Sequence, residues 1–144
     1  MNPSKIEIRK LSIIQEFEIF GTWSDKYLHI INLSKDLPEF PKNKKNEDNR
    51  IKGCQSKVWF CHETRGKKII FFGLSDSSIV SGLVSILIRL YSNSYPQEII
   101  EYPINFIKEI GLDKHISQHR NNSLYEIIKL IYNIANRYKN NSTL

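Results

Sequence analysis

The order of apolar and polar positions predicts two helices at the start of the chain. Between residues 4 and 20, apolar side chains recur three or four positions apart, which is typical of an amphipathic helix that Gly21 ends. Thr22 followed by Asp25 has the spacing of a helix-capping box. We therefore expect a second helix to begin there and to end before Pro38.

Strand-like alternation follows a long polar stretch. Apolar and polar residues alternate over positions 58–62, and residues 69–74 supply a second apolar run. The segment between them, residues 63–67, contains Gly66, as a hairpin turn requires. The pattern predicts an antiparallel hairpin, in which Cys61 lies in mid-strand and packs as a small hydrophobic side chain.

The remainder of the chain has the periodicity of helices. Residues 76–91 are apolar on nearly all sides, which predicts a buried helix at the centre of the core, with its start capped by residues 75–78. Prolines should start two short helices, at 96–100 and at 103–110, the second closed by Gly111. A last helix is expected over 122–139. This order predicts an α+β fold, with a small antiparallel sheet packed against helices in one domain, residues 1–144.

Composition narrows the class of protein. The 144 residues begin without an apolar signal core, and the most apolar run, 79–91, is too short and too polar to span a membrane. We therefore expect a cytoplasmic protein with no membrane partner. The net charge of +6 comes with many Lys, Ile and Asn residues and no Arg-rich stripe, so we predict no nucleic-acid partner, although a basic nucleic-acid-binding domain stays an alternative.

The two cysteines provide the candidate chemistry. A reducing compartment disfavours a disulfide between them, and the spacing from Cys54 to Cys61 and His62 matches no common zinc motif, so we expect no metal. Cys54 ends a polar loop and follows Gly53, which can adopt turns that present the neighbouring thiol. Positive charges nearby favour the thiolate, the reactive form. Cys54 is therefore interpreted either as a reactive thiol or as an ordinary residue of a polar loop.

The run RIKGCQSKVW at residues 50–59 is the most specific of several blocks that follow one another along the chain. Further blocks lie at 23–33, 37–38, 75–83, 96–99 and, more loosely, 117–120. In sequence and order these blocks resemble the SufE family of sulfur-acceptor proteins in iron–sulfur cluster assembly, and the run at 50–59 is similar to the active-cysteine loop of that family. The resemblance implies the fold shared by SufE and IscU proteins.

The resemblance also implies a function. In this family a cysteine takes sulfane sulfur from a PLP-dependent cysteine desulfurase, holds it as a persulfide and passes it to a cluster scaffold; here that residue is Cys54. The implied partners are a SufS-like desulfurase and a SufBCD-like scaffold, with no cofactor in this chain and a monomer or weak homodimer as the oligomeric state. The implied partner-binding residues are Arg50, Lys52, Gly53, Gln55 and Ser56.

Two further residues match family positions near the cysteine. Asp76 is interpreted either as a helix cap or as a direct participant in transfer, and Arg120 either as a site residue or as a solvated charge. After Arg120 the family continues Ser-x-Gly-Leu, whereas this chain reads NNSL. We expect apolar neighbours such as Trp59 to shield the sulfur. An IscU-like iron–sulfur or zinc scaffold is the alternative function, although two cysteines are few for such a site.

Overall fold

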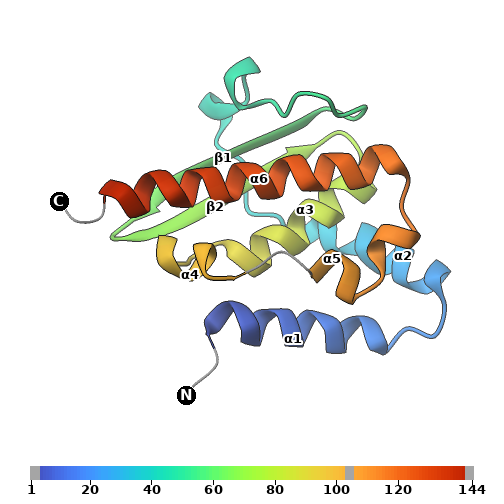
Figure 1. Cartoon of the computed structure of the whole chain (residues 1–144). Coiled ribbons are helices and arrows are strands. Elements are labelled where there is room, and N and C mark those ends of the chain that lie inside the picture. The colour runs from blue at the N-terminus through green and yellow to red at the C-terminus, as the bar shows by residue number, and fades with distance from the viewer. Residues whose placement is uncertain (1–3, 103–105, 142–144) are drawn as a thin grey trace.

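The structure is a computed structural model that describes residues 4–102 and 106–141. A helical layer and a two-stranded hairpin make up the fold (Figure 1). The predicted α+β class is confirmed. The elements in chain order are α1 (Lys5–Glu18), α2 (Trp23–Leu33), β1 (Val58–Arg65), β2 (Lys68–Ser75), α3 (Ser78–Tyr91), α4 (Pro96–Ile100), α5 (Phe106–Glu109) and α6 (Gln118–Asn141), with short 3-10 turns at Ser34–Asp36, Lys42–Lys44, Glu47–Asn49 and Leu112–Lys114.

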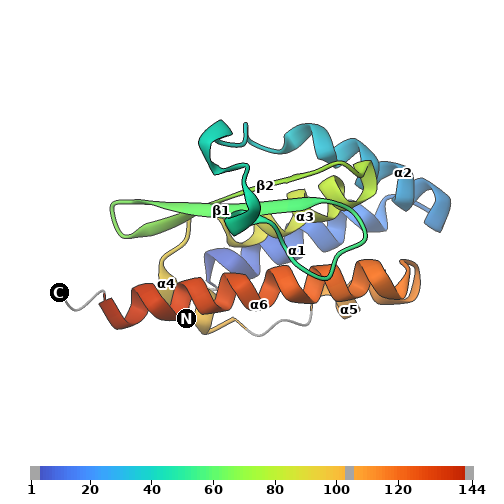
Figure 2. The ribbon, with the colours of Figure 1, turned by 90° about the horizontal axis from the view of Figure 1, so that it is seen from above.

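The hairpin is antiparallel, with Val58 opposite Ser75 at its open end and Arg65 opposite Lys68 at its closed end. Only two residues form the turn, and Gly66 adopts a left-handed conformation there (φ 63°). The prediction of a turn over residues 63–67 was therefore too long, because the polar residues at the end of β1 continue the strand into solvent. Seen from above, the hairpin lies over α3 and runs alongside α6 (Figure 2).

Helix α3 forms the centre of the core, as its nearly continuous apolar sequence predicts. Helix α2 packs closely against it at Gly82, where an added Cβ would lie 1.8 Å from the backbone oxygen of Ile30. Gly73 of β2 allows a similar approach, because a Cβ there would lie 2.3 Å from Val84. These two glycines allow α2 and the hairpin to approach α3 closely, and so fix where the open end of the hairpin lies relative to α3.

Several predicted helix boundaries differ from the structure. Helix α3 begins at Ser78 after the cap residue Ser77, whose side chain accepts a hydrogen bond from the Val80 amide. Helix α6 begins at Gln118 rather than at residue 122. In the described part of the predicted helix at 103–110, helix α5 spans Phe106–Glu109, and residues 103–105 lie outside the described residues.

The long polar stretch before the hairpin, residues 38–52, contains two of the short 3-10 turns and passes above the hairpin (Figure 1). Phe40 anchors this segment in a small second cluster with Cys61 and Phe72. Within the described ranges, none of the helices has both the length and the apolar content needed to cross a membrane.

Candidate functional site

A six-residue loop, residues 52–57, carries Cys54 at the open end of the hairpin. The loop is closed on one side by a backbone hydrogen bond from the Ile51 amide to the Val58 carbonyl oxygen (2.8 Å), beside an antiparallel bridge between Arg50 and Trp59. Gly53 adopts a left-handed conformation (φ 83°) that side chains rarely tolerate. The chain can therefore turn sharply just before Cys54 while the bonds on either side hold the ends of the loop.

Asp76 holds the other side of this loop. Its Oδ1 accepts a hydrogen bond from the Lys57 amide (3.0 Å), and its own amide donates to the Lys57 carbonyl oxygen (3.2 Å). Of the two interpretations of Asp76, the structure does not support that of a helix cap, because Ser77 occupies the cap position. Both Asp76 and Ser77 are of a residue type that can cap a helix. Because Ser77 caps α3, the side chain of Asp76 can bind the loop instead. The contacts make Asp76 a positioning residue for the segment that bears the cysteine.

The thiol of Cys54 is partly buried. One side of Cys54 packs against the main hydrophobic core, and the other lines a pocket of about 230 Å³ with Glu47, Gly53 and the segment 50–52. Cys54 thus lies at the boundary between apolar packing and an open pocket. This arrangement can shelter a group attached to sulfur on one side and admit a reaction partner on the other.

Arg120 lies beside the same loop. It lines a second pocket, of about 280 Å³, to which Gln55 and Ser56 contribute from the loop and Val80 from the start of α3. The structure therefore brings Arg120, Gln55 and Ser56 together, as expected of a common site. The NNSL sequence that replaces the family's Ser-x-Gly-Leu forms no turn here, because Arg120 already lies in the first turn of α6 and the helix continues through residues 121–124.

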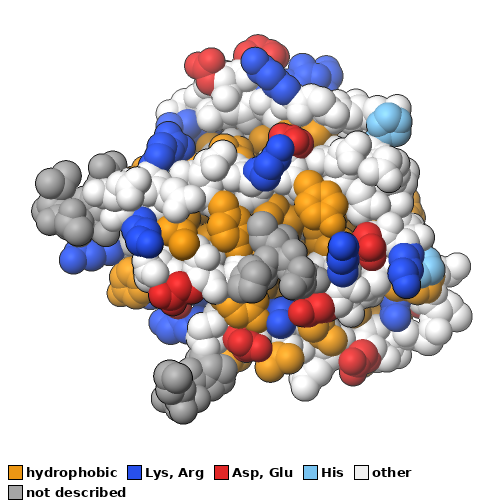
Figure 3. Space-filling model, in the orientation of Figure 1, with side chains coloured by type: hydrophobic (Ala, Val, Ile, Leu, Met, Phe, Trp, Pro, Cys, Tyr) orange, Lys and Arg blue, Asp and Glu red, His pale blue; other side chains and the backbone are white. Residues whose placement is uncertain are grey.

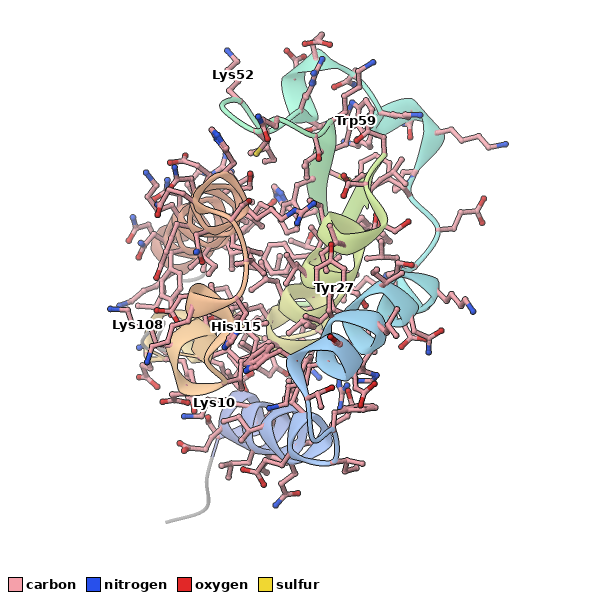
Figure 4. The ribbon with its side chains drawn as sticks, turned by 90° about the vertical axis from the view of Figure 1, so that its right-hand side faces the viewer. Lys10, Tyr27, Lys52, Trp59, Lys108 and His115 are labelled. Atoms are coloured by element: carbon pink, nitrogen blue, oxygen red, sulfur yellow. The ribbon has the colours of Figure 1, made fainter. Side chains whose placement is uncertain are left out.

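The basic residues near Cys54 have different surroundings. The guanidinium of Arg50 lies 3.5 Å from the carboxylate of Glu47, so part of its charge is balanced locally. Lys52 is exposed at the tip of the loop and points away from the body of the protein (Figure 4). Lys57 contacts Asp76 through its backbone. The accessible positive charge closest in sequence to Cys54 is therefore that of Lys52.

The expected shielding of Cys54 by Trp59 is not what the structure shows. Trp59 packs in the small cluster with Cys61 and Phe72, whereas Cys54 packs against the main core. Successive residues of a strand point to opposite faces, and the indole of Trp59 lies on the face away from α6, where Lys45 lies over its ring at 4.8 Å (Figure 4). The apolar neighbours of Cys54 belong to the core instead.

Cys61 lies in mid-strand and is only 6% exposed, as the sequence predicted. Burial raises the pKa of its thiol; the charge of Lys44 opposes this effect and that of Glu63 adds to it. Searched over the described ranges, the protein holds no group of three or more His, Cys, Asp or Glu side chains placed to share a metal ion.

Two features of the site lacked a signal in the sequence. Glu47 and Ser123 each line a pocket beside the cysteine loop, although both belong to polar stretches with no recognisable pattern. Asn121 is buried because its side-chain amide donates to the carbonyl oxygens of Asp113 (2.9 Å) and Ile116 (3.5 Å). This contact ties the preceding segment to the first turns of α6 and so helps to place Arg120.

Comparison with known proteins identifies the family. The family model described as "SufE: Fe-S metabolism associated domain" matches residues 11–135. The chain therefore belongs to the SufE family, and this membership indicates a role in iron–sulfur metabolism.

Individual relatives agree with this assignment. An uncharacterised SufE-like protein of Rhizobium meliloti is 35% identical over 124 residues, which cover 83% of this chain and 89% of that protein. A second, from Rhizobium etli, is 36% identical over 124 residues, covering 83% of this chain and 84% of its own length. The solution structure of a hypothetical protein from Thermus thermophilus has the same fold, with a TM-score of 0.76 at 14% identity, covering 92% of this chain and 96% of that one.

Proposed function

We propose that Cys54 accepts sulfur from a PLP-dependent cysteine desulfurase and passes it to an iron–sulfur cluster scaffold. The observation that carries the proposal is the setting of the thiol. Cys54 is partly buried on a short loop whose two ends are bonded to the hairpin and to Asp76, and a pocket lies on each side of the loop. Family membership supports the same role.

The proposed step is a thiol exchange with no net oxidation. The thiolate sulfur of Cys54 attacks the outer sulfur of a persulfide on the desulfurase. A new S–S bond forms on Cys54 while the S–S bond of the donor breaks, and the donor cysteine leaves as a thiolate. Transfer to the scaffold repeats the same exchange with Cys54 as donor. In this scheme PLP belongs to the partner, and this chain supplies the carrier thiol.

The surroundings of Cys54 fit both halves of such a cycle. Contact with the core restricts access of bulk thiols to a sulfur carried on Cys54. The pocket lined by Gln55 and Arg120 offers polar groups at the edge of the loop, where a partner surface would meet it. Because Asp76 bonds the backbone rather than the thiol, its proposed role is to keep the loop in place during the exchange.

Mapping of added sulfur tests the proposal. The protein is incubated with the desulfurase and cysteine, and its peptides are analysed by mass spectrometry for a persulfide. We expect the added sulfur on Cys54 and its loss, together with loss of desulfurase stimulation, in Cys54→Ser. The matched variant Cys61→Ser should keep both. Sulfur found on Cys61 and absent from Cys54 would contradict the assignment.

A further inference from the structure

A groove larger than either pocket at the cysteine loop lies between β1 and α6. Its volume is about 500 Å³, within the range of about 300–1,000 Å³ that is usual for ligand sites. Residues 48–52 form one wall, residues 60–62 of β1 form the floor, and α6 forms the other wall from Glu126 to Arg137. At the far end, the Tyr138 hydroxyl lies 2.9 Å from Nε2 of His62 and bridges helix and strand.

The charges that line the groove are mainly positive. Four basic and two acidic residues line the groove, which gives it an excess of positive charge; the basic residues are Arg50, Lys52, Lys129 and Arg137, and the acidic ones are Asp48 and Glu126. Two of the basic groups already have carboxylate partners, since Lys129 pairs with Glu126 (2.9 Å) and Arg50 with Glu47.

The two remaining basic groups are available to a ligand. Over the ranges that the structure describes, neither Lys52 nor Arg137 forms an ion pair with a side chain of the protein. The charge of Arg137 also reaches the floor of the groove: burial is the main cause that lowers the pKa of His62, and repulsion by Arg137 and Lys44 adds to it. An anionic ligand would relieve this repulsion at one end of the groove, and at the other end it would draw in the solvent-exposed side chain of Lys52. Figure 3 shows Lys and Arg side chains both along α6 and above it.

The groove also has apolar walls and an elongated shape. Ile51 and Leu130 are half-buried in its walls, and Ile134 is buried beneath them. From Glu126 to Arg137 the helix rises about 16 Å, which is the length of about five residues of extended chain. Side chains of an extended peptide alternate between two faces. A segment with alternating acidic and apolar residues therefore matches the groove in length, charge and polarity.

The groove continues into the pocket of Cys54. The segment 50–52 lines both of them, so a peptide in the groove would lead directly to the cysteine loop. We propose that this groove binds an extended acidic segment of the protein that exchanges sulfur with Cys54. The identity of that partner rests on the proposed function, whereas the binding of an acidic peptide follows from the groove itself.

The first experiment uses the full chain labelled with ¹⁵N and a synthetic peptide, acetyl-Glu-Val-Glu-Val-Glu-amide. On titration we expect amide shifts to concentrate at residues 50–52, 60–62 and 126–137, and to weaken as salt is added. The analogue with Gln in place of Glu should bind at least about tenfold more weakly, because it keeps the length and loses the charge. A DNA oligonucleotide of equal charge serves as the competitor.

Charge reversals locate the site. Arg137→Glu should raise the dissociation constant of the acidic peptide at least about tenfold. Lys35→Glu makes the same change of net charge at an exposed position outside the groove, and should leave peptide binding unchanged. Shifts confined to other surfaces, no shifts at millimolar peptide, equal loss in both variants, or tighter binding of the oligonucleotide to the same residues would each overturn the proposal.

A second measurement separates this proposal from the function. In the sulfur-mapping assay, Arg137→Glu should raise the half-saturating concentration of this protein for the desulfurase or for the scaffold about tenfold, and Lys35→Glu should not. If wild-type protein receives no sulfur on Cys54, the proposed function fails while peptide binding still stands. If, in Arg137→Glu, sulfur reaches Cys54 from the desulfurase and leaves it for the scaffold as well as in the wild type at all concentrations, the groove does not serve this exchange.

Discussion

The two cysteines, seven positions apart in the sequence, occupy opposite settings. Cys54 lies in a loop between two pockets and is partly open to solvent, whereas Cys61 is 6% exposed within a strand. Cys61 contributes a small apolar side chain to a cluster with Phe40 and Phe72. The backbone conformation around each cysteine therefore determines whether its thiol is accessible. The left-handed Gly53 and the hydrogen bonds at both ends of its loop keep Cys54 accessible, whereas Cys61 is buried within a paired strand.

Chemical modification should separate the two thiols most clearly. In the folded protein we expect iodoacetamide to label Cys54 at least about 100-fold faster than Cys61, because a local opening that costs about 3 kcal/mol already lowers the exposed population by this factor. Burial also raises the pKa of Cys61 and so lowers its thiolate fraction. Mass spectrometry of quenched samples measures both rates. In denaturant the rates should converge, and similar rates in the native protein would remove the distinction.

Substitution of the buried Cys61 should lower the stability of the fold more than substitution of the accessible Cys54. Cys61→Ser places a hydroxyl in an apolar cluster and should lower the free energy of unfolding by about 2 kcal/mol, a loss that the fold can bear. Cys61→Ala, which leaves a small cavity without a polar group, should cost about 1 kcal/mol. Cys54→Ser should change stability by less than about 0.5 kcal/mol, as expected of a loop position. Urea unfolding measures all three, and a larger loss at position 54 would contradict the comparison.

The smallest expected effect concerns the support of the loop. Asp76→Ala removes the acceptor for the Lys57 amide and should slow sulfur transfer to Cys54 several-fold, with a loss of stability of about 1 kcal/mol or less. Asp76→Asn keeps an acceptor oxygen without the charge and should restore most of the rate. Single-turnover transfer from the desulfurase distinguishes the two variants. Equally slow transfer in both variants would show that the carboxylate charge acts directly in the exchange.

Much of the fold is predictable from local patterns, and the exceptions have physical causes. The apolar sequence of α3 and the Gly at position 66 identify a central helix and a hairpin correctly. The start of α6 was missed because its first turns are polar. In the structure the Ser117 hydroxyl accepts a hydrogen bond from the Arg120 amide (3.3 Å) at the start of this helix. Asn121 binds the carbonyl oxygens of the preceding segment, a contact that no periodicity reveals.

The residues that the resemblance singles out lie around one loop, and their roles were less predictable. Cys54 lines one pocket beside this loop, and Gln55, Ser56 and Arg120 line another. The role of Asp76 depends on which of two adjacent residues caps α3, and sequence alone does not separate them. The groove between β1 and α6 brings residues 60–62 together with residues 126–137, more than sixty positions further along the chain, so only the folded chain could reveal it.

The pairing of the hairpin has a consequence for how the length of this chain can vary during evolution. Lys57 and Asp76 meet because each directly adjoins the open end of the hairpin, next to the pair Val58 and Ser75. The register of the two strands thus determines whether Lys57 and Asp76 meet. An insertion at the Gly66 turn lies at the far end of the hairpin and leaves this register unchanged. A deletion within either strand shifts the register by one residue, turns the side chains beyond it to the other face and separates the loop from Asp76.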